Sequence, residues 1–490
     1  MKKEHPFAWK IVNNYQSFII FLVAECLAFV GFGLANVNII FRFLGFVVAI
    51  VLLAYALLFS PKTERNNFIV FALPLLIYSI LMCLSVFGGA YFDAFDNISI
   101  FVGLPSFLFL GYAVKKIKNV NIDIFFIVIG VSLALLLLIS GIYSLTRYGF
   151  FHPLIYKNMF YYFEGELFDV SREMKFLIGF SFPEVSLKYV GLFATLLTGF
   201  LGAIFFINPK KDYKKFFIYL AVGLVGLFTN LFITNVFALV ITAFTFVIIT
   251  LYRFLPKKKK ITKICLLVTY VLVGLVSLFA LSFIINAAAG NLAFIKENEF
   301  LSKLYITSSF TKPWHDAIFL MTRPEGIFGI TNYVTENGVY SMYLFNAKYG
   351  VSIDFPINSG SYIFDAAMEG GLFAFLLIIL FTVLAIISTV RYISKSNDEK
   401  YRKAILIGVL LSSVLYANLF FDSMPLIHND ATYYSFARTM PMLIILFFVG
   451  YSFYPFFKVK DIILEQKVID EEYQKDLTTE SEDKEDEEDE

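Results

Sequence analysis

Charged residues are scarce in this sequence, and so are cysteine, histidine and tryptophan. Only 16% of the 490 residues are charged and 59% are hydrophobic, whereas a soluble domain has about 25% charged residues. The shortage of charge excludes an ordinary water-soluble domain. Apolar runs also reach the roughly 20 residues that a bilayer-crossing helix needs. We therefore expect an all-α polytopic membrane protein.

The few cysteines exclude a disulfide framework. Cys26, Cys83 and Cys265 all fall inside apolar segments that are expected to cross the membrane. No CxxC or HExxH spacing occurs, so no metal site is predicted. The sequence also lacks a glycine-rich phosphate loop, a serine elbow and a kinase-like motif set, which leaves ATP-driven chemistry without support. We expect no cofactor and no nucleic-acid partner.

Apolar length and the positions of lysine and arginine predict about twelve transmembrane helices with both termini in the cytoplasm. Basic clusters such as "NPKKDYKK" and "RFLPKKKK" fall in alternate loops, which sets the predicted orientation. The first apolar run is expected to be retained as a span, because no small-residue cleavage site follows it. The expected spans lie near 16–36, 39–59, 67–87, 98–114, 122–144, 185–207, 264–285, 371–390, 404–420 and 439–457, with two more inside 216–252.

Two long polar segments, about 145–184 and 286–370, are predicted to be extracytoplasmic loops of a transmembrane domain that covers residues 1–457. Such loops tend to carry function. From Lys458 onward 15 acidic residues face 5 lysines, so the tail carries a net charge of −10 and the body +11. We expect residues 458–490 to be a disordered, solvated cytoplasmic tail that could bind a partner.

Charged residues gather in the longer outer segment around "TKPWHDAIFLMTRPEGIFGI". They are Lys312, His315, Asp316, Arg323 and Glu325, and Glu369 follows at the expected mouth of the span near 371–390. Proline and two glycines break the backbone directly after the arginine. Each residue alone fits a water-exposed loop, but the group together favours a functional site.

Basic residues also occur around the first outer loop, where the positive-inside bias disfavours them. Arg147, Arg172 and Lys188 could bind an anionic ligand, or they could pair with the acids interleaved among them. His428 and Arg438 flank the last outer loop. A lone histidine there is compatible with simple solvation.

Two segments carry a resemblance to a known family. "KPWHDAIFLMTRPEGIFGI" and "INSGSYIFDAAMEGGLFAFLLIIL" resemble the signature region of the O-antigen polymerase and ligase superfamily, which includes the Wzy-type polysaccharide polymerases. "PEGIFGI" fits the P-x-x-G-x-G turn of that family loosely. "MEGGLFA" fits its E-x-G-x-x-G element from Glu369, with Ala374 at the final glycine. The histidine common before the late span is missing, and Asn358 stands there.

The resemblance implies a metal-independent glycosyltransferase in a bacterial cytoplasmic membrane. Such an enzyme moves a growing glycan from one polyprenyl diphosphate onto the next lipid-linked repeat unit, on the outer face, and so builds a capsule, an exopolysaccharide or an O-antigen. Expected partners are the polyprenyl-diphosphate-linked oligosaccharide and membrane lipid. Other polysaccharide-assembly proteins could bind through the acidic tail.

The implied chemistry assigns roles to the candidate residues. Arginine and lysine stabilise the charge on a departing diphosphate, and the residues expected to do so are Arg147, Arg172, Arg323 and Lys312. A carboxylate or imidazole takes the proton of the acceptor hydroxyl, and the candidates are Glu369, His315 and Asp316. Lys188, Glu325, His428 and Arg438 are further candidates.

Three other functions stay open on the sequence alone. A polysaccharide ligase would use the same donor and a different acceptor. A lipid-linked oligosaccharide flippase or other transporter could also have about twelve spans, but short loops and internal repeats would be expected of it. A non-catalytic scaffold with a signalling tail would leave the outer polar residues dispensable.

Overall fold

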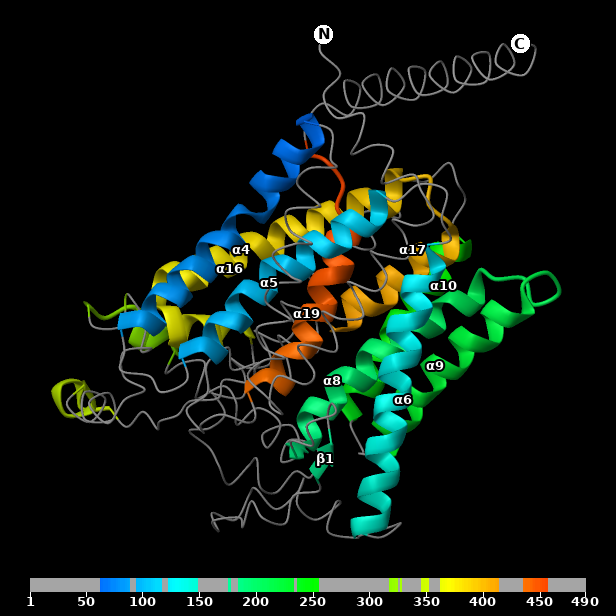
Figure 1. The fold of residues 1–490 in the computed structure, drawn as a ribbon, viewed down its shortest axis with the longest axis horizontal. Helices are drawn as coiled ribbons and strands as arrows, with labels where there is room; N and C mark the ends of the chain where they lie inside the picture. Colours follow the sequence, from blue (N-terminus) through cyan, green and yellow to red (C-terminus); the bar gives the residue numbers. More distant parts are fainter. Residues whose placement is uncertain are drawn as a thin grey trace, which may run out of the picture.

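The described part of the chain is largely helical (Figure 1). The computed structural model describes residues 62–88, 94–116, 122–148, 175–177, 184–232, 236–254, 317–324, 327, 345–351, 362–413 and 435–456. Its main helices are α4 (Lys62–Gly88), α5 (Ala94–Lys116), α6 (Asp123–Tyr148), α8 (Leu187–Thr198), α9 (Tyr213–Phe232), α10 (Val236–Phe254), α16 (Tyr362–Lys395), α17 (Lys400–Leu406) and α19 (Ser435–Tyr451). Two short strands, β1 (Lys175–Leu177) and β2 (Glu184–Ser186), form an antiparallel pair.

The helices lie where apolar length places the expected spans. Within the described residues, three segments are long and apolar enough to cross a membrane, namely Glu64–Met82 in α4, Tyr213–Leu231 in α9 and Gly370–Lys395 in α16. The expected spans near 16–36, 39–59 and 264–285 lie outside the described residues, as does the acidic tail. The helical class is therefore confirmed for the described residues, whereas the number of spans and their orientation stay predictions.

Two helices continue beyond the apolar runs that predicted them, into the segments expected to be outer loops. Helix α6 continues to Tyr148, so Arg147 lies in its last turn rather than in the loop. Helix α16 begins at Tyr362, so Glu369 lies within the helix, directly before its membrane-capable segment Gly370–Lys395. The reason is the same in both cases: a helix satisfies its own backbone hydrogen bonds, and it can continue beyond the apolar run that suggested it.

The last span is also shifted from its expected position. Helix α19 begins at Ser435, which places Arg438 in its first turn, and ends at Tyr451. Residues 453–456 are not helical. This segment is aromatic and apolar, so hydropathy alone extends the span through it. The N–H of Phe453 still bonds to Gly450 of α19, but from Tyr454 onward the backbone is bound by side chains of α16.

Glycines set the closest helix contact of the described bundle, between α5 and α19. A Cβ atom on Gly111 would lie 1.8 Å from the carbonyl oxygen of Phe447, and one on Gly450 would lie 1.9 Å from that of Leu108. The two backbones therefore touch, as small residues permit in membrane helices. Around this crossing, the buried ring of Phe68 on α4 stacks on that of Tyr112 at 4.0 Å.

A second glycine crossing coincides with two departures from α-helical geometry. The 3-10 helix η3 (Gly199–Phe205) follows α8, and the π-helix η7 (Ile407–Leu411) follows α17. A Cβ atom on Gly199 would lie 2.5 Å from the nitrogen of Val409, and one on Gly408 would lie 2.3 Å from the oxygen of Gly199. The tightened and the widened helix thus meet backbone to backbone.

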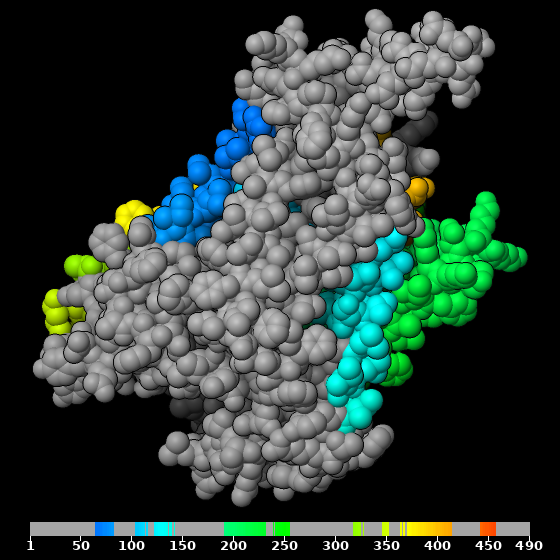
Figure 2. Space-filling model, viewed as in Figure 1, coloured from blue at the N-terminus to red at the C-terminus, as the bar shows by residue number. Residues whose placement is uncertain are grey.

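The outward faces of several helices are apolar. On α16 the exposed residues recur at helical spacing and are Phe373, Leu376, Leu380, Val383 and Ile387. Figure 2 shows α6 in cyan and the segment 191–254 in green on one flank of the molecule. Exposed side chains there include Ile139, Ile142, Phe228 and Phe244. Apolar surface of this extent is unusual for a protein in water and suits contact with lipid.

One end of the bundle, here called the basic end, gathers helix termini from distant parts of the sequence. The start of α6, the start of α9 and the start of α17 meet there at Asp123, which accepts from Lys215 Nζ at 2.6 Å and from Arg402 Nε at 2.7 Å. The basic clusters predict that these termini lie in loops on one side of the membrane. Their direct contact shows that they do lie at one end.

Candidate functional site

The two segments that carry the family resemblance are in direct backbone contact. The N–H of Leu372 donates a hydrogen bond of 3.0 Å to the carbonyl oxygen of Ile327. Ile327 belongs to "PEGIFG" and Leu372 to "MEGGLFA", so a bond between residues 45 positions apart closes the site.

A break inside α16 makes that bond available. Gly371 has φ 70° and ψ −161°, a conformation outside the helical region that glycine adopts readily. The break diverts the amide of Leu372 from the regular helical ladder to Ile327. The neighbouring Gly370 is tightly enclosed, because a Cβ atom there would lie 2.4 Å from Ala374 Cβ and 2.9 Å from Met82 Sδ. Both glycines of "MEGG" are thus needed by the local geometry.

Arg323 lies against two aromatic rings just before this contact. The central carbon of its guanidinium is 4.4 Å from the ring centre of Phe319 and 5.1 Å from that of Tyr349. The two rings are nearly perpendicular, at 84° with centres 6.0 Å apart. They form a corner, here called the aromatic seat, that holds the guanidinium by cation–π attraction.

The aromatic seat is built on a small apolar core that reaches across the break in α16. Ala317, Leu320, Phe345 and Phe364 are its buried members, and Phe375 packs against them. Phe364 precedes Gly371 and Phe375 follows it, with ring centres 6.0 Å apart. The core therefore fastens the segments 317–324 and 345–351 to both halves of α16.

The guanidinium of Arg323 has no acidic partner among the described residues. Its Nε atom is buried and lacks a hydrogen-bond acceptor in that part of the chain, although the side chain as a whole is only partly buried. A buried donor without a partner carries a free-energy cost of about 1–3 kcal/mol. Among the described residues, the guanidinium is thus held by aromatic rings and by no carboxylate.

The structure places the other predicted residues unevenly. Glu369 lies in α16 three residues before Leu372, but only its backbone is described. The same holds for Arg147 at the end of α6, Lys188 at the start of α8 and Arg438 at the start of α19. The remaining candidates lie outside the described residues, and they are Lys312, His315, Asp316, Arg172, Glu325 and His428.

Arg147 is not brought to the aromatic seat. In Figure 1 the end of α6 lies at the bottom of the molecule, whereas the start of α16 lies at the left. The described geometry joins Arg323 with the segment of Glu369, and it does not add Arg147 to them.

Sequence reasoning missed the aromatic seat itself. Phe319 could have been found, because it lies four residues before Arg323 in "FLMTR" and would share its face of a helix. Tyr349 follows 26 residues later, and nothing in its spacing indicates the contact. Among the described residues, no group of three or more His, Cys, Asp or Glu side chains could hold a metal ion.

The charged cluster at the basic end has a different character, because its charges are paired. Arg402 also binds Asp398, with Nη1 2.6 Å from Oδ1, and Tyr451 donates to Asp398 at 2.9 Å. Burial, together with the hydrogen bond that the hydroxyl of Tyr401 donates to Asp123, raises the pKa of Tyr401. These groups satisfy one another, so the cluster acts as a structural fastening.

Comparison of the sequence with models of known protein families and with curated proteins gives no match. The class of the protein is therefore defined by its fold alone. It is a largely helical chain with helices that can span a membrane, and an arginine held by aromatic rings lies beside a broken helix.

Proposed function

We propose that the chain is a multi-pass membrane glycosyltransferase that polymerises polyprenyl-diphosphate-linked repeat units into a surface polysaccharide of a bacterium. The observation that carries the proposal is the hydrogen bond between Leu372 and Ile327, because it joins the two segments that resemble the polymerase and ligase superfamily. Arg323 lies four residues before Ile327, and Glu369 lies three before Leu372. A cation and a carboxylate are thus carried into one region of the protein.

The proposed reaction is a displacement at the anomeric carbon of the donor sugar. The acceptor hydroxyl oxygen forms the new glycosidic bond, and the bond between the anomeric carbon and the diphosphate oxygen breaks. The proton of the hydroxyl passes to a base, for which Glu369 is the first candidate and His315 or Asp316 the alternatives. The energy comes from the glycosyl phosphate bond, so the reaction needs no nucleotide.

Arg323 would stabilise the negative charge that grows on the departing diphosphate. Its rings hold the guanidinium in place before the charge develops, which is the preorganisation that electrostatic catalysis requires. Lys312 and Arg172 are the further cations proposed for the diphosphate, whereas Arg147 is left out because the end of α6 does not lie beside the start of α16 (Figure 1). About twelve spans, with the two long loops on the outer face, complete the proposal.

Reconstitution of the full chain in vesicles with a lipid-linked repeat unit tests this function. Longer glycans on the lipid carrier would support the polymerase, and transfer onto a different acceptor would indicate a ligase. Movement of the repeat unit across the bilayer without growth would replace the proposal with a flippase.

Arg323→Ala should abolish polymer without lowering the protein level. Arg253→Ala is a matched control, because Arg253 also lies over an aromatic ring, that of Phe254 at 5.7 Å, but at the basic end. Full-length polymer from the Arg323→Ala protein would refute the role of Arg323.

A further inference from the structure

The chain leaves α19 through a short segment that is bound tightly at the basic end. Residues 452–456, here called the strap, are held by side chains of α16: Thr389 and Ser452 share a hydrogen bond of 2.7 Å, and Ser388 Oγ accepts from the N–H of Tyr454 at 2.8 Å. Arg391 donates to the carbonyl oxygen of Phe456 at 2.7 Å. The chain is therefore held in place as far as Phe456, two residues before the acidic tail begins.

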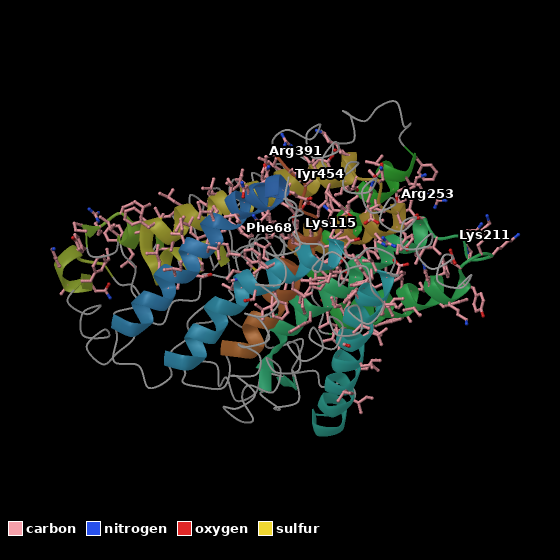
Figure 3. All side chains as sticks on the ribbon, turned by 45° about the horizontal axis from the view of Figure 1, so that its top comes forward. Phe68, Lys115, Lys211, Arg253, Arg391 and Tyr454 are labelled. Atoms are coloured by element: carbon pink, nitrogen blue, oxygen red, sulfur yellow. The ribbon has the colours of Figure 1, made fainter. Side chains whose placement is uncertain are left out.

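Cations from α5 and α16 converge on the same strap. Lys115 donates to the carbonyl oxygen of Phe453, and its ammonium lies 4.6 Å from the ring centre of Tyr392. Figure 3 shows Lys115, Arg391 and Tyr454 together at this end, with Arg253 and Lys211 farther out on it. Positive charge from two helices therefore surrounds the strap that precedes the acidic tail.

Two inward cations of the basic end are neutralised by carboxylates, whereas a set of outward cations is exposed. Lys215 and Arg402 pair with buried carboxylates. The outward set, here called the cationic rim, is exposed, has no acidic partner among the described residues, and consists of Lys210, Lys211, Lys214, Arg253, Lys395 and Lys400. Only Asp212 and Glu399 interrupt it with exposed negative charge.

Direct contacts join the elements that carry the rim. Lys215 on α9 contacts Tyr401 on α17 at 3.5 Å, and the hydroxyl of Tyr252 on α10 donates to the carbonyl oxygen of Ile393 on α16 at 3.5 Å. The helices that carry the rim are therefore joined to one another by direct contacts.

We propose that the acidic tail binds the cationic rim of its own chain. Residues 458–490 carry a net charge of −10, against a rim whose cations no described carboxylate compensates. The strap holds the tail near the rim, which gives it a high effective concentration there. An extended chain covers about 3.3 Å per residue, so the tail can easily cross a bundle whose helices pack about 10 Å apart.

An anionic lipid surface could also bind the rim. The negative charge of the tail argues against lipid and tail binding there at the same time. Anionic headgroups attract basic segments and repel an acidic one. Tail and lipid would therefore compete for the rim. Binding of this electrostatic kind is screened by salt, since the rim is exposed.

Carbodiimide cross-linking of the full chain, purified in a non-ionic detergent without anionic lipid, tests the proposal. Within single chains, the carboxylates of residues 480–490 should link to Lys210, Lys211 or Lys214 at 50 mM salt. These links should fall at least several-fold at 500 mM salt. An absence of links to the rim, or links only between two copies, would overturn the proposal.

A charge variant of equal length gives an independent measurement. In it, every Asp and Glu from position 480 to 490 is replaced by Asn or Gln, a change outside the helices described above. Acylation of the three lysines should become at least about threefold faster than in the natural chain, while Lys348, at the opposite end, keeps its rate. Equal rates at the rim in both proteins would overturn the proposal.

Discussion

The side chain of Arg323 lies against two aromatic rings, and each ring contributes its own cation–π contact to holding the guanidinium in place. A cation–π contact is worth about 0.5–2 kcal/mol. Tyr349→Leu should therefore slow polymerisation about 2- to 30-fold, as measured by initial rates in vesicles. Tyr349→Phe keeps the ring and removes only the hydroxyl, so its rate should stay near that of the natural chain. Equal losses in both variants would point to the hydroxyl and contradict the role of the ring.

Asp123 is the residue on which the basic end depends most. Asp123→Asn would leave Lys215 and Arg402 without their shared charge, and since both are partly solvated we expect a loss of about 2–3 kcal/mol in the free energy of unfolding. Thermal unfolding in detergent measures it. Asp212→Asn is the control, because that carboxylate is exposed. A similar change in both proteins would mean that the buried network adds no stability.

At the scale of the element, we expect a substitution at the break in α16 to reduce activity more than backbone strain alone would. An alanine at positive φ costs roughly 1–2 kcal/mol. Gly350 has φ 64° with no atom near its missing side chain, so Gly350→Ala isolates that cost. Gly371→Ala should lose most polymerisation per folded molecule, because it also threatens the bond from Leu372 to Ile327. Comparable activity in the two variants would contradict this.

The crossing of α5 and α19 makes a second prediction about elements. Gly111→Ala brings a methyl group against the backbone of Phe447, which cannot give way, and should cost at least about 2 kcal/mol. Gly130→Ala meets only the side chains of Phe200 and Val222, at 3.2 Å, and should cost less than about 1 kcal/mol. Detergent melting curves of the two single variants distinguish them.

Apolar runs predict the helices of this protein well, but not the places where helices change their geometry. The turn between α9 and α10 falls within "TNLFITN", as the flanking basic clusters indicate. The 3-10 and π segments, by contrast, depend on Gly199 meeting Gly408, and no periodicity in either segment records the other. Boundaries fail for a related reason, because Tyr362 and Ser435 begin helices in polar sequence.

At the scale of the whole molecule, the predicted topology can be tested at two exposed lysines. Lys348 lies beside the aromatic seat and Lys395 at the basic end of α16. In intact cells, Lys348→Cys should react with a membrane-impermeant maleimide, and Lys395→Cys only after the membrane is opened. Each variant is compared with the natural chain, which has its own cysteines. Reaction of both from outside would contradict the predicted orientation.

The site illustrates what a sequence can and cannot indicate about the complete molecule. Arg323 and Glu369 stand out because their segments resemble a known pattern, and the bond between Ile327 and Leu372 joins those segments. The aromatic seat could not be foreseen, since Tyr349 reaches Arg323 only through the packing of three separate segments. Likewise, positive-inside bias predicts which termini share an end, but not that Asp123 would connect them.

Helix α16 is bound to the strap near its C-terminal end and broken near its N-terminal end. The side chains of Ser388, Thr389 and Arg391 bind it to the strap, and the break at Gly371 lies 17 residues before Ser388. The core around Phe364 and Phe375 spans this break, so the short N-terminal part that bears Glu369 is held at a set angle to the long part of the helix.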